Sequence, residues 1–194
     1  MSVRAMPANC CDTSRNSEAS AANDMQAQVN IRPLREADWP AVWAFMKPVI
    51  RAGDTYPYAM DMTVEGARKM WIEAPAATYV AEDERGNIVG TYYIKPNQPT
   101  LGAHVANCGY MVAEQARGMG IATRMCKHSQ EEALQMGYRA MQYNLVVRTN
   151  EPSVYLWQKL GFTIVGTLPG AFRHAGHGYV DAYIMYKTLV DDSA

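Results

Sequence analysis

The sequence predicts a mixed α/β domain, with a mostly antiparallel central sheet and helices on both of its faces. Strand-like and helix-like stretches follow one another in the order β-α-α-β-β-β-α-β-α-β-β, as in a mixed sheet covered by helices. A hairpin turn joins two early strands, and a glycine-containing turn leads from a later strand directly into a helix. With 194 residues, the chain has room for one domain with a sizeable core and is too short for two ordinary ones.

The first half of the chain is expected to open the sheet. Apolar residues recur at helical spacing from Trp39 to Met46, which indicates a helix that follows the first strand. Thr63 is a suitable N-cap for a second, short helix that runs to about residue 71. The strands expected in this half cover residues 29–33, 78–84 and 88–96, and a turn at 85–87 joins the last two.

In the second half, strands and helices alternate. Gly137 and Gly161 each follow a helical pattern and are expected to end it. The expected strands cover residues 103–112, 139–147, 162–168 and 179–189, and the expected helices run from the glycine turn to about 136 and from 150 to 160.

Composition narrows the choice of partners. The formal net charge of −1 provides no basic surface for a phosphate backbone, which argues against nucleic acid and anionic membranes. No stretch approaches the ~18 apolar residues of a membrane span, and the first residues lack the apolar core of a signal peptide. We therefore expect a cytoplasmic protein with a small-molecule partner.

Residues 1–28 are rich in serine, alanine, asparagine and acidic residues and nearly free of large apolar ones. Such a segment cannot bury enough surface to offset its ordering entropy, so we expect a disordered tail before a domain at 29–190. The four cysteines lack the spacing of metal ligands and are expected to be free thiols: Cys10, Cys11, Cys108 and Cys126.

The stretch VAEQARGMGIATRM, residues 112–125, predicts an anion site. A glycine turn that leads into a helix presents unpaired backbone N–H groups at the positive end of the helix dipole, which suits a phosphate. Gly118 and Gly120 let the backbone approach the anion closely, and Arg117 adds a charged donor. An ordinary strand-to-helix turn is the alternative. A dinucleotide fingerprint does not fit, because Thr123 replaces its third glycine, and the Gly-Lys-Ser/Thr of a Walker A loop is absent.

This stretch resembles motif A of the GNAT superfamily of acetyl-CoA-dependent N-acetyltransferases, Arg/Gln-x-x-Gly-x-Gly/Ala, at Arg117, Gly120 and Ala122. A second segment, NEPSVYLWQKLGF at residues 150–162, resembles the family's later helix, which begins Asn-x-x-Ser/Ala and ends in Gly-Phe. Together the two segments identify the chain as a member of the superfamily, over about residues 29–188. The resemblance implies a sheet whose two central strands splay apart.

The resemblance also implies how acetyl-CoA would be held. It places the pyrophosphate on backbone N–H groups of the glycine turn and the pantetheine arm against the backbone of Val112, with Asn150 near that arm. The residues assigned to the turn are Arg117, Gly118, Met119, Gly120, Ile121 and Ala122.

A closer likeness is to the fungal N-acetyltransferases that act on the proline analogue L-azetidine-2-carboxylate. It rests on GDTYP, GTYYIKPN, NCGYMV, NLVVRTN and GYVDAYIMY, between about residues 53 and 189. The resemblance assigns acceptor binding and catalysis to Asn107 and Asn144, and it also links Asn150 to the site. An amide can orient a substrate carboxylate or polarise a thioester carbonyl without adding charge. Each of these three asparagines could instead be a buried residue that satisfies backbone groups, and Asn150 could be an N-cap.

Several residues depart from the pattern or invite other interpretations. Many family members carry a tyrosine, thought to protonate the leaving thiolate, where this chain has Trp157, a weak donor. His174 and His177 lie in a glycine-rich stretch without a nearby third ligand, so we expect no metal there and interpret residues 169–181 as a flexible loop that borders the acceptor site. The tryptophans expected in the core are Trp39, Trp43 and Trp71.

The predicted function is therefore transfer of an acetyl group from acetyl-CoA to a small amine. The acceptors that the resemblance implies are cyclic imino acids or an intermediate of the proline pathway. Another amino acid, a xenobiotic amine, or a catalytically weak acetyl-CoA-binding module remain as alternatives, and the sequence leaves open whether the chain forms a homodimer.

Overall fold

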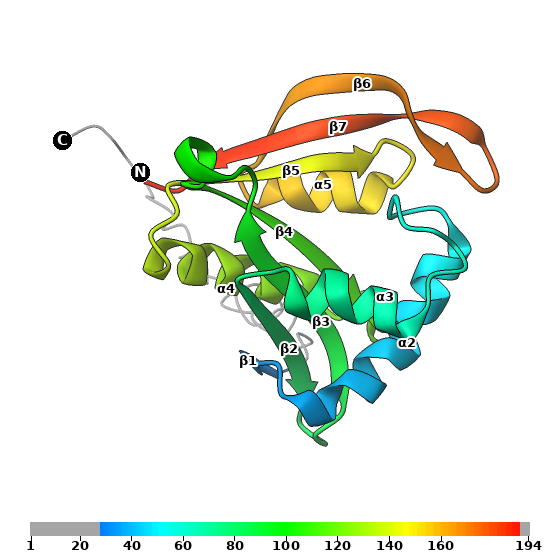
Figure 1. Cartoon of the computed structure of the whole chain (residues 1–194), viewed down its shortest axis with the longest axis vertical. Helices are drawn as coiled ribbons and strands as arrows, with labels where there is room; N and C mark the ends of the chain where they lie inside the picture. Colours follow the sequence, from blue (N-terminus) through cyan, green and yellow to red (C-terminus); the bar gives the residue numbers. More distant parts are fainter. Residues whose placement is uncertain (1–27, 191–194) are drawn as a thin grey trace, which may run out of the picture.

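The strands of the computed structural model, which describes residues 28–190, form one sheet in the order β1-β2-β3-β4-β5-β7-β6 (Figure 1). All neighbours are antiparallel except β4 and β5, which are parallel. This confirms the predicted fold class and the predicted order of elements. The strands are β1 (Val29–Pro33), β2 (Ala77–Asp83), β3 (Ile88–Pro96), β4 (Val105–Val112), β5 (Ala140–Val147), β6 (Thr163–His174) and β7 (Gly178–Thr188).

Helices cover both faces of the sheet. The indole N–H of Trp71 donates to the buried Thr91 hydroxyl (3.1 Å) on one face, and Tyr92 packs against His128 of α4 on the other. Thr63 caps the short helix as predicted, since its hydroxyl accepts from Gly66 N–H (3.1 Å). The helices are α2 (Trp39–Ala52), α3 (Val64–Arg68), α4 (Ile121–Gln135) and α5 (Glu151–Lys159), with short turns η1 (Glu36–Asp38), η2 (Lys69–Glu73), η3 (Thr100–Gly102) and η4 (Glu114–Ala116).

The core is rich in aromatic side chains. Trp39 and Trp71 are buried, and Trp43 packs against the same cluster while partly exposed, so the predicted core role of all three tryptophans is confirmed. Among the described residues, Cys108 and Cys126 are free thiols, as expected, and burial raises the pKa of both. Cys10, Cys11 and residues 1–27 of the predicted tail lie outside the described residues.

One expected loop is largely sheet. Residues 169–174 continue β6 instead of forming a flexible loop, because Phe172 and Arg173 pair with β7 and the Phe172 side chain is buried. Only a tight turn separates β6 from β7, and its Ala175 N–H donates to Gly53 C=O (3.0 Å) at the end of α2. The tip of the β6–β7 hairpin is therefore bonded to the end of α2.

The two central strands diverge along their length (Figure 1). β4 and β5 pair only at Val105–Ala140 and Ala106–Met141. At the next position the Asn107 amide donates to Gln142 C=O (2.9 Å), so a side chain spans the gap that the backbones no longer close. β5 also bulges against β7 between Tyr143 and Val146, and a bulge bends its strand. The splay therefore coincides with a side-chain bridge from β4 and a bulge in β5.

Candidate active site

The turn before α4 presents a set of backbone donors. Gly118 (φ +79°) and Gly120 (φ +76°) adopt the left-handed conformation that glycine tolerates best. The first backbone bond of α4 runs from Arg124 N–H to Gly120 C=O (3.1 Å). Gly120, the N-cap, has no side chain that could accept from the N–H groups of the first helical residues. These donors lie at the positive end of a 15-residue helix and can hold an anion.

A cavity of about 810 Å³, which we call the turn cavity, begins at these donors. Its other walls come from the end of β4, the first turns of α5, the loop after α2 and His174 at the hairpin tip. Most of the residues predicted to bind the cosubstrate line it together: Val112, Arg117, Gly118, Gly120, Ile121, Ala122 and Asn150. Met119 is not among the lining residues, and its side chain is exposed.

The inner end of the turn cavity lies at the open edge of β4. There the Tyr56 hydroxyl, from the loop after α2, donates to Tyr110 C=O and accepts from Tyr110 N–H (3.0 Å). Both backbone groups belong to the part of β4 that has no pairing with β5. The sequence prediction did not single out Tyr56; its only signal was the GDTYP stretch that contains it.

The Tyr110 side chain points to the face of the sheet that α4 and α5 cover. Its hydroxyl bonds those of Ser129 (2.7 Å) and Tyr143 (3.0 Å), and its ring lies 5.0 Å from that of Trp157, which is buried and lines the turn cavity. Burial raises the pKa of Tyr110 and Tyr143 well above the ordinary value, so both phenols stay neutral. Neither can act as a base at physiological pH.

The two predicted catalytic asparagines do not line the turn cavity. Asn107 is buried, and it accepts from the Tyr93 hydroxyl (3.3 Å) while its amide donates to β5. Asn144 is exposed at the bulge of β5, where it donates to Asn97 Oδ1 (2.6 Å) and accepts from Gln142 Nε2 (2.8 Å). The structure thus brings Asn144 into a cluster of three neutral amides, Asn97, Gln142 and Asn144, and places Asn107 between the strands nearby.

Two further residues have defined roles. Asn150 caps α5, because its side-chain oxygen accepts from Ser153 N–H (3.4 Å), and it also lines the turn cavity.

His174 Nδ1 accepts from Gly176 N–H (3.0 Å), which places the ring proton of neutral His174 on Nε2. His174 and His177 lie together (ring centroids 4.5 Å apart), but within residues 28–190 no three His, Cys, Asp or Glu side chains group to hold a metal ion.

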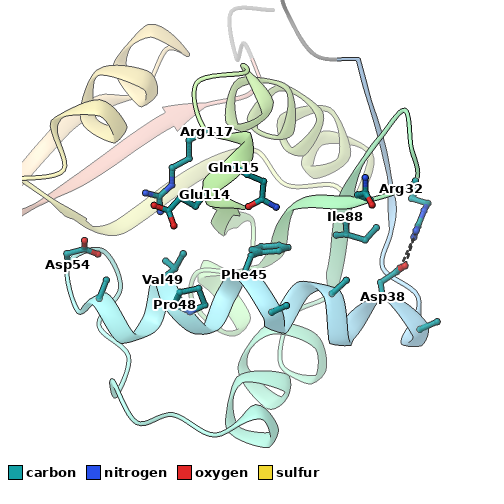
Figure 2. Close-up of a pocket in the computed structure, with 16 residues that line it drawn as sticks. Arg32, Asp38, Phe45, Pro48, Val49, Asp54, Ile88, Glu114, Gln115 and Arg117 are labelled. Carbon is teal, nitrogen blue, oxygen red and sulfur yellow. Dashed lines mark hydrogen bonds and ion pairs between the residues drawn. The ribbon is translucent and has the colours of Figure 1, made fainter.

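A second cavity, of about 750 Å³, lies between α2, the β2–β3 turn and η4 (Figure 2). We call it the α2 cavity. Arg32 stands at one end, bonded to Asp38 (2.7 Å) and Glu82 (2.6 Å), while Glu114 and Arg117 point into the other end (Figure 2). Three residues line both cavities: Val49, Asp54 and Arg117.

Comparison with known proteins agrees with this geometry. The model of the acetyltransferase (GNAT) family matches residues 36–162. N-acetyltransferase aca1 of Schizosaccharomyces pombe is 33% identical over 156 residues, which cover 72% of this chain and 75% of that protein. An N-alpha-acetyltransferase of Sulfurisphaera tokodaii is 36% identical over 130 residues, 60% of this chain and 72% of that protein. A GCN5-related N-acetyltransferase from Kribbella flavida superposes with a TM-score of 0.79 at 41% identity, over 82% of this chain and 97% of its own.

The chain therefore belongs to the GNAT family of acetyltransferases. It is an acetyl-CoA-dependent N-acetyltransferase, as the sequence predicted. No helix among the described residues is long and apolar enough to cross a membrane.

Proposed function

We propose that this enzyme acetylates the ring nitrogen of a small cyclic imino acid such as L-azetidine-2-carboxylate. The observation that carries the proposal is the amide cluster of half-buried Asn97 and Gln142 and exposed Asn144, which lies at the bulge of β5 beyond its pairing with β4. Amides offer donors to a carboxylate and acceptors to a ring N–H without a fixed charge. The fungal relative aca1 and the motifs shared with azetidine acetyltransferases support the same substrate class.

Acetyl-CoA would lie along the turn cavity. The N–H groups at Gly118, Gly120 and the start of α4 suit its pyrophosphate, and Arg117 adds a charge-assisted donor at the rim. The open backbone edge near Val112 suits the amides of the pantetheine arm, because β5 does not pair with it. The thioester would then reach the inner end, at Tyr110.

The acceptor would approach from the amide cluster. Asn107 holds the two strands at the start of the splay, where its amide bonds Gln142 C=O, and Asn144 is exposed to bond a carboxylate. We propose that Asn107 positions the opening and that Asn144 orients the acceptor, so that its neutral nitrogen faces the thioester carbon. The leaving thiol needs no strong acid, because a thiol with a pKa near ~8.5 departs readily as a thiolate. This is consistent with Trp157 in place of a tyrosine.

A panel of amines tests the proposal through thiol release from acetyl-CoA. We expect L-azetidine-2-carboxylate to give a higher kcat/KM than a lysine-containing peptide or a peptide with a free N-terminus. The rate should rise with pH, because amines with a pKa near ~10 are mostly protonated at neutral pH and only the neutral form attacks. Preference for either peptide would contradict the substrate class.

The N-terminal peptide is in the panel for a specific reason. The relative from Sulfurisphaera tokodaii is an N-alpha-acetyltransferase, so an α-amino group on a peptide is the second candidate acceptor. Thiol release that no amine accelerates would instead support a module that only binds acetyl-CoA.

A further inference from the structure

The open edge of β4 is already occupied by one hydroxyl of the chain itself. Tyr56 Oη bonds both backbone groups of Tyr110, although 54 residues separate them in the sequence. In a sheet, the N–H and C=O of one residue are paired by a neighbouring strand. Here β5 has diverged, and a single phenol takes the place of that strand.

The Tyr56 ring is held on two sides. It stacks on Tyr58, with centroids 5.2 Å apart and planes at 12°, and meets Trp71 edge-on at 6.1 Å. Burial raises the pKa of Tyr56 well above its ordinary value, so the phenol keeps its proton and acts as a donor. A fixed, neutral donor at the inner end of the turn cavity is the kind of group that stabilises developing negative charge.

We propose that the Tyr56 hydroxyl and the Tyr110 N–H together bind the thioester oxygen during acetyl transfer; this rests on the proposed function in that the thioester reaches the inner end of the turn cavity. The two donor atoms are 3.0 Å apart. One oxygen can therefore lie within about 3 Å of both, which is the geometry of an oxyanion site. The oxygen would replace the hydroxyl as the partner of Tyr110 N–H, and the phenol proton would turn from Tyr110 C=O toward it.

The electron balance needs no further reactant. The acceptor nitrogen forms a bond to the carbonyl carbon, and the C=O π pair moves onto oxygen, where the two donors stabilise the charge. The nitrogen loses its proton to water. The C=O bond then reforms as the C–S bond breaks, and the pair leaves with sulfur as a thiolate. Tyr56 gives a hydrogen bond throughout and keeps its proton.

Replacement of Tyr56 by phenylalanine removes only the hydroxyl and keeps the ring. We expect Tyr56→Phe to lower kcat by about 100-fold, as for loss of one oxyanion donor, with calorimetric affinity for acetyl-CoA changed by less than about threefold. Tyr58→Phe is the matched control, because it removes a hydroxyl from the stacked neighbour, whose hydrogen bond is to Tyr93 of β3, and should keep nearly full turnover. Melting temperatures show whether each variant is folded.

Isotope-edited infrared spectra of acetyl-CoA labelled at the carbonyl carbon give a readout that needs no acceptor. Two donors should lower the bound carbonyl stretch below its solution value in the wild type, and Tyr56→Phe should shift it back toward that value. A wild-type band at the solution frequency would overturn the proposal without any variant, as would full turnover in folded Tyr56→Phe. Because this arm needs no acceptor, rejection of every imino acid in the amine panel would defeat the proposed substrate class and leave the oxyanion pair standing.

Discussion

Two cavities among the described residues are similar in size, and their linings differ in kind. The turn cavity, of about 810 Å³, is lined by backbone donors that no helix or strand uses and by the open edge of β4. The α2 cavity, of about 750 Å³, is lined by the side of α2 and by charged side chains, of which Arg32 is already paired with Asp38 and Glu82 (Figure 2). Their volumes alone would not show which of the two cavities is a binding site.

The difference shows what marks a binding site here. A buried or half-buried polar group without a partner raises the free energy of the folded protein. A ligand that bonds this group removes that cost. Arg32, Asp38 and Glu82 satisfy one another, so a ligand at that end of the α2 cavity would compete with existing ion pairs. The donors at Gly118 and Gly120 have no such competitor in the helix they precede. Arg117 lines both cavities and can serve the turn cavity without disturbing the pairs at Arg32.

The largest expected effect is at the turn. Gly120→Glu should abolish acetyl-CoA binding in calorimetry, because a carboxylate would stand where the pyrophosphate must approach the backbone. Any non-glycine residue is also strained at φ +76°.

Gly137→Glu controls for that strain. Gly137 is also left-handed (φ +87°), has open space around its Cβ position, and is absent from the lining of the turn cavity. Both variants should lose some thermal stability, and only the Gly120 variant should lose binding. Equal affinities in the two would remove the turn from the site.

The next effects concern Asn144 in the amide cluster and Trp157 in the turn cavity. Asn144→Ala should lower kcat/KM for the imino acid by about 10- to 100-fold, the value of a hydrogen bond to a charged group, with acetyl-CoA affinity unchanged. Trp157→Phe should cost less turnover, because expulsion of the thiolate needs no strong acid. Steady-state kinetics at saturating acetyl-CoA measure both, and melting temperatures separate lost packing at the buried indole from lost chemistry. A tryptophan variant that binds acetyl-CoA and yet turns over more slowly than Asn144→Ala would contradict the role of Asn144.

The smallest effect is expected in the α2 cavity. Asp38→Asn should leave acetyl-CoA affinity unchanged and lower the free energy of unfolding by about 1 to 2 kcal/mol at neutral pH. Its hydrogen bond from Arg32 holds the pKa of Asp38 below the ordinary value. The stabilisation is therefore complete above about 3.9, the pKa of an unpaired aspartate, and is lost as the pH falls through the folded-state pKa. Denaturant titrations should show that the free energies of unfolding of the wild type and of Asp38→Asn converge in acid. A difference that stays constant with pH would mean that the ion pair is not the source of the lost stability.

The sequence predicted the turn better than the inner end, and the reason is distance along the chain. Gly118, Gly120 and the start of α4 are neighbours, so a local pattern specifies the whole arrangement. The bond between Tyr56 and Tyr110 joins residues 54 apart, and a tyrosine in a loop has no spacing that indicates its partner. Likewise, the amide of Asn107 meets a carbonyl 35 residues away, which only the register of β4 and β5 determines.

The same reasoning explains the misjudged loop. Residues 169–174 begin with Pro169 and Gly170, which favour a loop locally. β7 nevertheless supplies a complete partner strand, with shifts in register between Leu168 and Phe172 that absorb the irregular residues. Tertiary pairing outweighs local preference there, and the tip so formed brings His174 to the turn cavity.

Hydrogen–deuterium exchange at short labelling times tests most directly whether acetyl-CoA occupies the turn cavity. On addition of acetyl-CoA, exchange should slow in peptides that cover residues 110–124, where backbone N–H groups would bond the pyrophosphate and the pantetheine arm. Peptides that cover the β2–β3 turn at residues 84–88, which belongs to the α2 cavity alone, should exchange as before. Protection at 84–88 with none at 117–124 would contradict the assignment of the acetyl-CoA site.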